Sequence, residues 1–172
     1  LRMLRWSQRN PRIATAYAGL VLVLAVGLAV TGYLLGETRS SLREVEPATG
    51  RILRRLDLDP QQFAEGLALA GDRLFQLTYQ SELGWVWDLE TFTRLRDFSY
   101  RGEGWGLTFD GTSLIQSDGS ARLTFRSPVD FASQRELLVV RGGRPQFYLN
   151  ELEWVNGEIW ANVWQSDEIL RI

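Results

Sequence analysis

The chain has 172 residues, a formal net charge of −2, no cysteine and no histidine, and all 19 of its basic residues are arginine. The missing imidazole and thiol exclude Ser-His-Asp and Cys-His nucleophile systems and remove the main ligands of protein zinc sites. The missing lysine excludes Schiff-base catalysis, so any reaction in this chain must use carboxylates, amides, hydroxyls, indoles or guanidinium groups.

The first 36 residues differ in composition from the rest. Four arginines and no acid precede residues 13–35, an uncharged apolar run of the length, about 20 residues, that a helix needs to cross a bilayer. The arginines before it and Glu37 after it suit the positive-inside rule. We therefore expect residues 1–36 to be an uncleaved membrane anchor. A cleaved signal peptide, with small residues at 29–31, and a buried core helix or strand pair are the alternatives.

Residues 37–172 carry all the carboxylates and form the second predicted domain. With the anchor oriented in this way, we expect this domain on the outer face of a bacterial membrane, in the periplasm or at the cell surface. It has no basic face of the kind that nucleic-acid binders present, so no nucleic-acid partner is predicted.

From Ser40 onward, short alternating segments separated by turn dipeptides predict an all-β fold. Three segments, 63–80, 102–120 and 149–165, align without gaps around the turns Gly71-Asp72, Asp110-Gly111 and Asn156-Gly157. Glycine, asparagine and aspartate accept a positive φ at low cost, so these turns favour hairpins. A repeat of roughly 40–47 residues with about four strands per unit is typical of β-propeller blades. A plain antiparallel meander or sandwich is the alternative.

Residues 40–58 have the pattern of the outer half of an earlier blade, whose inner half would coincide with residues 18–36. In that alignment Leu24-Ala25 occupies the turn position, and neither residue favours a tight hairpin. The apolar segment therefore fits a membrane helix better than a blade strand pair.

Six short motifs in this part of the chain occur in order and at suitable spacing: EGL, LTYQ, EGWGLT, SDGS, NELE and ANVWQ. Over residues 40–172 they resemble the plant and bacterial glutaminyl cyclases (glutamine cyclotransferases), which are five-bladed β-propellers. The resemblance implies a partial β-propeller of about three blades plus a remnant, following the N-terminal apolar transmembrane helix. It also implies a glutaminyl-peptide cyclotransferase, which converts the N-terminal glutamine of peptides or proteins to pyroglutamate and releases ammonia without a metal or cofactor.

The resemblance also implies roles for individual residues. Glu65 would be the carboxylate that shuttles the proton, and Asn150 would hold the scissile amide and orient its carbonyl. The two are equivalent in the repeat, each six residues before its turn. Equivalent positions of propeller blades converge near the axis, so we expect the two side chains to meet. The expected walls of the substrate pocket are aromatic: Phe63, Tyr79, Trp105 and Trp164.

Some features weaken the expectation of activity. Ala18 stands where the family has a polar active-site residue, and the family's last blades contribute a lysine that this chain lacks. Tyr79 stands where the family usually has tryptophan. The alternative function is therefore an inactive, truncated, membrane-anchored propeller that binds peptides or proteins. Three further glutamates, Glu103, Glu151 and Glu153, fit solvated charges better than supporting acids, and no cluster has metal-ligand spacing.

Overall fold

The structure, a computed structural model, describes residues 40–172, which form one compact unit. All regular elements in this part of the chain are strands: β1 (Ser41–Val45), β2 (Ile52–Asp57), β3 (Ala64–Ala70), β4 (Arg73–Thr78), β5 (Leu83–Asp88), β6 (Arg94–Ser99), β7 (Leu107–Phe109), β8 (Leu114–Gln116), β9 (Arg122–Arg126), β10 (Ser133–Leu138), β11 (Val140–Arg141), β12 (Arg144–Pro145), β13 (Leu149–Val155), β14 (Glu158–Val163) and β15 (Ile169–Arg171). The predicted all-β fold is confirmed.

The predicted anchor over residues 1–36 lies outside the described residues. Residues 40–172 contain no helix with the length and hydropathy that a bilayer crossing requires.

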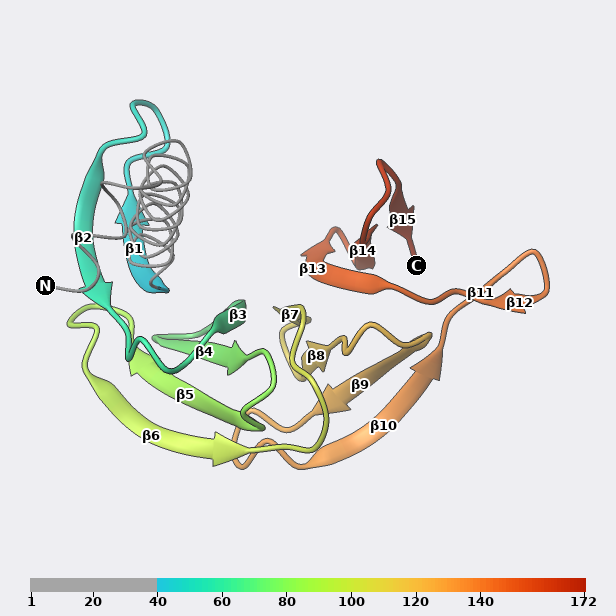
Figure 1. The fold of residues 1–172 in the computed structure, drawn as a ribbon, viewed down its shortest axis with the longest axis horizontal. Helices are drawn as coiled ribbons and strands as arrows, with labels where there is room; N and C mark the ends of the chain where they lie inside the picture. Colours follow the sequence, from blue (N-terminus) through green and yellow to red (C-terminus); the bar gives the residue numbers. More distant parts are fainter. Residues whose placement is uncertain (1–39) are drawn as a thin grey trace, which may run out of the picture. The chain divides into compact units, whose positions relative to one another are not determined.

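Within each sheet, strands that follow one another in the chain are paired antiparallel (Figure 1). The strands β3-β4-β5-β6 and β7-β8-β9-β10 form two four-stranded sheets, and β13-β14-β15 form a three-stranded sheet. The pairs β1-β2 and β11-β12 are separate hairpins. In Figure 1, β3 and β7 lie next to each other, whereas β6 and β10 lie on the far side of their sheets. In both four-stranded sheets, therefore, the first strand lies close to the first strand of the other sheet, and the last strand lies farthest from it.

The three predicted turn dipeptides join the first two strands of the three sheets. The register pairs Ala70 with Arg73, which leaves a two-residue loop in which Gly71 has a φ of 65°. The loop between β13 and β14 also has two residues, Asn156 (φ 52°) and Gly157 (φ 89°). Positive φ at both positions is the geometry that matches the twist of a hairpin. The loop between β7 and β8 is longer and contains Gly111, with a φ of 94°.

Apolar side chains on both faces of the sheets form the core. The first four-stranded sheet packs against the second through a cluster that includes Phe75, Phe98 and Leu107. The second sheet packs against the three-stranded sheet through a cluster that includes Ile115 and Leu149. A third cluster, Leu42, Leu58, Leu74, Trp85 and Trp87, joins the β1–β2 hairpin to the first sheet. Since each sheet is covered by the next, the first strands of the three sheets are brought together.

Two glycines allow these first strands to approach closely. A Cβ atom on Gly66 of β3 would lie 2.7 Å from backbone atoms of Gly106 and Leu107. A Cβ atom on Gly106 would lie 2.8 Å from Cα of Glu151 and still closer to the carbonyl oxygen of Asn150. The Gly66 N–H donates to the carbonyl oxygen of Trp105 at 2.8 Å, which joins β3 to the segment before β7. Backbone contact is therefore continuous from β3 through β7 to β13.

Candidate functional site

A cavity of about 450 Å³ opens where these three strands begin. It is lined by the six residues to which the sequence assigned catalytic or substrate-binding roles: Phe63, Glu65, Tyr79, Trp105, Asn150 and Trp164. Glu65 and Asn150 belong to β3 and β13, and the four aromatic residues flank the strand ends. The structure thus brings together residues up to a hundred positions apart, while their chemical roles stay predictions.

Glu65 and Asn150 occupy equivalent irregularities of their strands. On β3 the pairing moves from Ala64↔Thr78 to Leu67↔Gln76, so one extra residue is inserted on the β3 side. On β13 it moves in the same way, from Leu149↔Val163 to Leu152↔Ala161. A bulge of this kind bends the strand and re-aims a side chain, and bulges are common next to active sites. Each bulge therefore releases one polar side chain from the ladder toward the cavity.

The position of Asn150 is fixed from β7 and β8 by Ser117. The buried Ser117 hydroxyl accepts a hydrogen bond from the Gly106 N–H at 2.8 Å and donates one to the Asn150 carbonyl oxygen at 2.6 Å. The SDGS motif, which begins at Ser117, thus has a structural part in the site. The serine clamps the two strands whose separation sets the place of the Asn150 side chain.

The aromatic walls form two pairs. The rings of Phe63 and Tyr79 meet edge to face with centroids 6.3 Å apart, and those of Trp105 and Trp164 do so at 5.5 Å. Phe63 is 55% exposed and Trp164 46% exposed, so both form the rim of the cavity. Trp105 is more deeply placed, because its ring lies against Gly119, where a Cβ atom would come within 2.7 Å of it.

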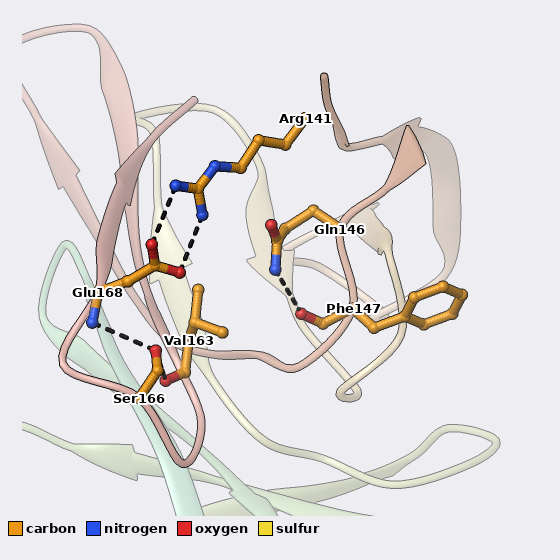
Figure 2. A network of polar contacts seen from close by, with 6 residues as sticks. All are labelled: Arg141, Gln146, Phe147, Val163, Ser166 and Glu168. Carbon is orange, nitrogen blue, oxygen red and sulfur yellow. Dashed lines mark hydrogen bonds and ion pairs between the residues drawn. The ribbon is translucent and has the colours of Figure 1, made fainter. Parts of the chain in front are cut away.

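Trp164 lies on the turn between β14 and β15, and backbone hydrogen bonds hold this turn both to itself and to the segment before β13. The Val163 N–H donates to the carbonyl oxygen of Glu168 at 3.0 Å, and the Trp164 N–H donates to that of Tyr148 at 2.9 Å. Figure 2 shows the guanidinium of Arg141, from β11, facing the Glu168 carboxylate through two hydrogen bonds of 2.9 Å. These contacts hold the backbone from which the indole projects.

Two neighbouring carboxyl groups, that of Glu65 in the cavity and that of Glu151 next to Asn150 in the chain, have raised pKa values. Partial burial raises the pKa of Glu65 above its ordinary value of 4.5. Burial, followed by repulsion from Glu65 and then from Glu153, raises the pKa of Glu151 to about 7. Glu151 also has a solvent-exposed surface, where water screens part of this repulsion. Because repulsion between carboxylates is mutual, ionisation of one group opposes ionisation of the other. The site can therefore hold a proton near neutral pH.

Sequence reasoning did not identify Tyr148 as part of this region. Its ring lies 6.2 Å from that of Trp164, and the residue is 55% exposed with a φ of 65°. The gapless repeat alignment contains the signal, because Tyr148 precedes Asn150 by two positions, as Phe63 precedes Glu65. Within residues 40–172, no three acidic side chains are grouped closely enough to hold a metal ion.

Comparisons with known proteins place the chain in a family. The model of the glutamine cyclotransferase family matches residues 18–172, and thus begins within the apolar segment rather than at Ser40. A glutaminyl-peptide cyclotransferase of Arabidopsis thaliana is 41% identical over 135 residues, which cover 78% of this chain and 42% of that protein.

A solved structure indicates the same family. The crystal structure of Myxococcus xanthus glutaminyl cyclase matches with a TM-score of 0.73 and 39% identity, covering 77% of this chain and 56% of that one. The WD40 domain of Neurospora crassa Pan2 matches with a TM-score of 0.56 at 9% identity, covering 78% of this chain and 41% of that one, which shows a likeness of fold alone. The chain thus spans about half the length of these relatives. The chain belongs to the glutamine cyclotransferase family.

Proposed function

We propose that this chain carries the reaction centre of a glutaminyl-peptide cyclotransferase, which closes the N-terminal glutamine of a peptide or protein into pyroglutamate and releases ammonia. The observation that carries the proposal is the meeting of Glu65 and Asn150, from equivalent bulges of β3 and β13, in one cavity with aromatic walls. The names of the relatives support the same reaction.

The reaction needs little beyond orientation and one proton shuttle. The free α-amine of the substrate attacks the carbon of its own γ-carboxamide, a carbon–nitrogen bond forms, and the original bond to the amide nitrogen breaks. Because both groups belong to one residue, a cavity that holds them in contact supplies most of the catalysis. Glu65 takes a proton from the attacking amine and returns one to the departing nitrogen, so that ammonia leaves and the carboxylate is regenerated.

The raised pKa of Glu65 suits this role, since a group that both accepts and returns a proton works best when its pKa approaches the working pH. Asn150 donates a hydrogen bond from its side-chain amide to the carbonyl oxygen under attack. This contact orients the amide and stabilises the negative charge that develops on that oxygen. No metal or cofactor takes part in this scheme.

The aromatic walls complete the binding site. Rings exclude water from the glutamine side chain, and their faces attract the cationic form of the amine before it loses its proton. The exposed rim residues Phe63 and Trp164 leave the mouth open, so the peptide chain beyond the first residue extends into solvent.

We propose that β3–β6, β7–β10 and β13–β15 are three blades of the family's five-bladed propeller, and that β1–β2 is the outer half of an earlier blade. Face-to-face packing of successive sheets and the repeated first-strand bulge support this arrangement.

We also propose that residues 13–35 tether the protein to the outer face of a bacterial membrane. The family match from residue 18 onward supports the other reading, an apolar strand pair of a divergent first blade. Fractionation after carbonate extraction separates the two, because a spanning helix stays with the membrane and a blade does not.

The cyclisation proposal is tested with a peptide that begins with glutamine. Mass spectrometry of the product follows loss of ammonia for the full chain, for Glu65→Gln, and for Glu90→Gln as a matched control on the exposed β5–β6 turn. We expect Glu65→Gln to slow the reaction by about 10²–10⁴-fold, and Glu90→Gln to leave it unchanged. If the chain bound the peptide without converting it, the result would contradict the proposed cyclisation activity and would support the alternative function, a propeller that only binds peptides.

A further inference from the structure

Glu103 forms hydrogen bonds that connect two walls of the cavity. Its carboxylate accepts a hydrogen bond from the indole N–H of Trp105 at 2.8 Å and another from the side-chain amide of Gln80 at 2.9 Å. Gln80 and Tyr79 follow β4, whereas Glu103 and Trp105 precede β7. One carboxylate thus cross-links the loops that carry two of the four aromatic wall residues.

The backbone around Glu103 is held as firmly as its side chain. The Gly104 N–H donates to the carbonyl oxygen of Tyr79 at 2.9 Å, and a Cβ atom on Gly104 would lie 2.7 Å from the carbonyl oxygen of Thr78. The carbonyl oxygen of Glu103 accepts from the Gln116 side chain at 3.2 Å. Glu103 is partly exposed, yet its carboxylate accepts two side-chain hydrogen bonds, so it fits a supporting acid better than a freely solvated charge.

The ring of Trp105 is constrained on three sides. Gly119 lies against its six-membered ring, Trp164 meets it edge to face at an interplanar angle of 72°, and the Glu103 carboxylate accepts a hydrogen bond from its N–H. The first two are van der Waals contacts, which have no preferred direction. The hydrogen bond to Glu103 is directional, so it selects one tilt.

We infer that Glu103 is a positioning residue, whose carboxylate sets the tilt of Trp105 and the place of the Tyr79 loop and so fixes the width of the slot that receives the substrate's glutamine side chain. The inference rests on the proposed function and deepens it. The hydrogen bonds from Gln80 and Trp105 hold the pKa of Glu103 below its ordinary value, so the accepting form persists throughout the neutral range.

The test compares Glu103→Ala, Glu103→Gln and the control Glu90→Ala in the full chain. Glutamine keeps the size and one acceptor oxygen for the Trp105 indole, and the Gln80 amide can turn to meet its new N–H group. Alanine removes both acceptors. Thermal denaturation identifies any variant that fails to fold, and Glu103→Gln then carries the comparison.

A spectroscopic readout is independent of activity. Two indoles with centroids 5.5 Å apart couple their electronic transitions, and the resulting circular dichroism couplet depends on the angle between the rings. The couplet is assigned by its loss in Trp105→Phe. We expect Glu103→Ala to lose or invert it, and Glu103→Gln and Glu90→Ala to retain it. A wild-type couplet in Glu103→Ala would overturn the inference.

Kinetics on a peptide with N-terminal glutamine provide the second readout. Because the slot binds the substrate rather than moving protons, we expect Glu103→Ala to raise KM about 10-fold with a smaller change in kcat, and Glu103→Gln to restore most of the loss. A KM for Glu103→Ala equal to that of Glu90→Ala would contradict the positioning role. A changed couplet in a chain without any cyclisation activity would support that role and count against the proposed function.

Discussion

Replacement of Gly106 by alanine tests how closely β7 must approach β13. A new Cβ atom would lie 2.8 Å from Cα of Glu151, where ordinary contact begins at 3.4 Å, so β13 must move by at least about 0.6 Å. Gly106 does not have a positive φ, so alanine adds a methyl group without backbone strain. Its obstacles are backbone atoms, which cannot turn aside as a flexible side chain does.

Overpacking of this kind costs about 1–3 kcal/mol. Movement of β13 also stretches the 2.6 Å hydrogen bond from Ser117 to the Asn150 carbonyl oxygen, which adds up to about 1 kcal/mol. We therefore expect Gly106→Ala to lower the free energy of unfolding by about 1–4 kcal/mol. Because the shift displaces Asn150, kcat/KM should fall about 10-fold or more.

Urea denaturation followed by tryptophan fluorescence measures the first quantity, and cyclisation of a peptide measures the second. The matched control is Gly111→Ala, where the new Cβ atom meets open space and only the φ of 94° opposes it, at about 1–2 kcal/mol. Equal destabilisation by the two substitutions, with unchanged kcat/KM in Gly106→Ala, would refute the close approach of the strands.

Three more predictions concern the surroundings of the site. Glu151 has a pKa of about 7 when folded and an ordinary value of 4.5, so the stability that its proton adds is fully present below the ordinary value and is lost as pH rises through 7. Urea midpoints should therefore fall between about pH 5 and about pH 8, and Glu151→Gln should flatten this dependence; an equal slope in the variant would contradict the assignment. Ser117→Ala leaves the Asn150 carbonyl and the Gly106 N–H without their partner and should cost about 2 kcal/mol in urea denaturation, whereas a neutral result would mean that the two strands need no clamp. Trp164→Ala removes an exposed rim ring and should raise KM for a glutaminyl peptide several-fold with kcat nearly unchanged; a drop in kcat alone would place Trp164 in the chemistry instead.

Most of what could be predicted about the fold and the site came from the sequence repeat. Glycine, asparagine and aspartate at three turns fixed the alignment of three segments, and this alignment made Glu65 and Asn150 equivalent. The structure places them in equivalent bulges beside one cavity. Residues at one place in a repeated unit come together when the units stack, so the convergence needed only the repeat and the resemblance.

Other features depend on contacts between units, which no repeat reveals. Gly106 was visible as part of a motif, but the reason for it lies in the backbone of β13, more than forty positions away. The Ser117 clamp joins the same two strands. The tether from Glu103 to Gln80 depends on the spacing of two loops that have no sequence relation to each other.

The raised pKa of Glu151 has a similar origin. In the alignment Glu151 corresponds to Gly66 and Trp105, so the repeat predicts no carboxyl group at this place. Burial and the nearness of Glu65 raise its pKa, and neither can be read from the local sequence.

The most direct test of the account is whether Glu65 and Asn150 act on the same substrate molecule. Initial rates of cyclisation are measured for the full chain, Glu65→Gln, Asn150→Ala and the double variant. If the carboxylate and the amide serve one reacting glutamine, their effects are strongly non-additive, and the double variant is little slower than Glu65→Gln alone. Effects that simply multiply, or a Glu65→Gln variant as fast as the unaltered chain, would contradict a shared reaction centre.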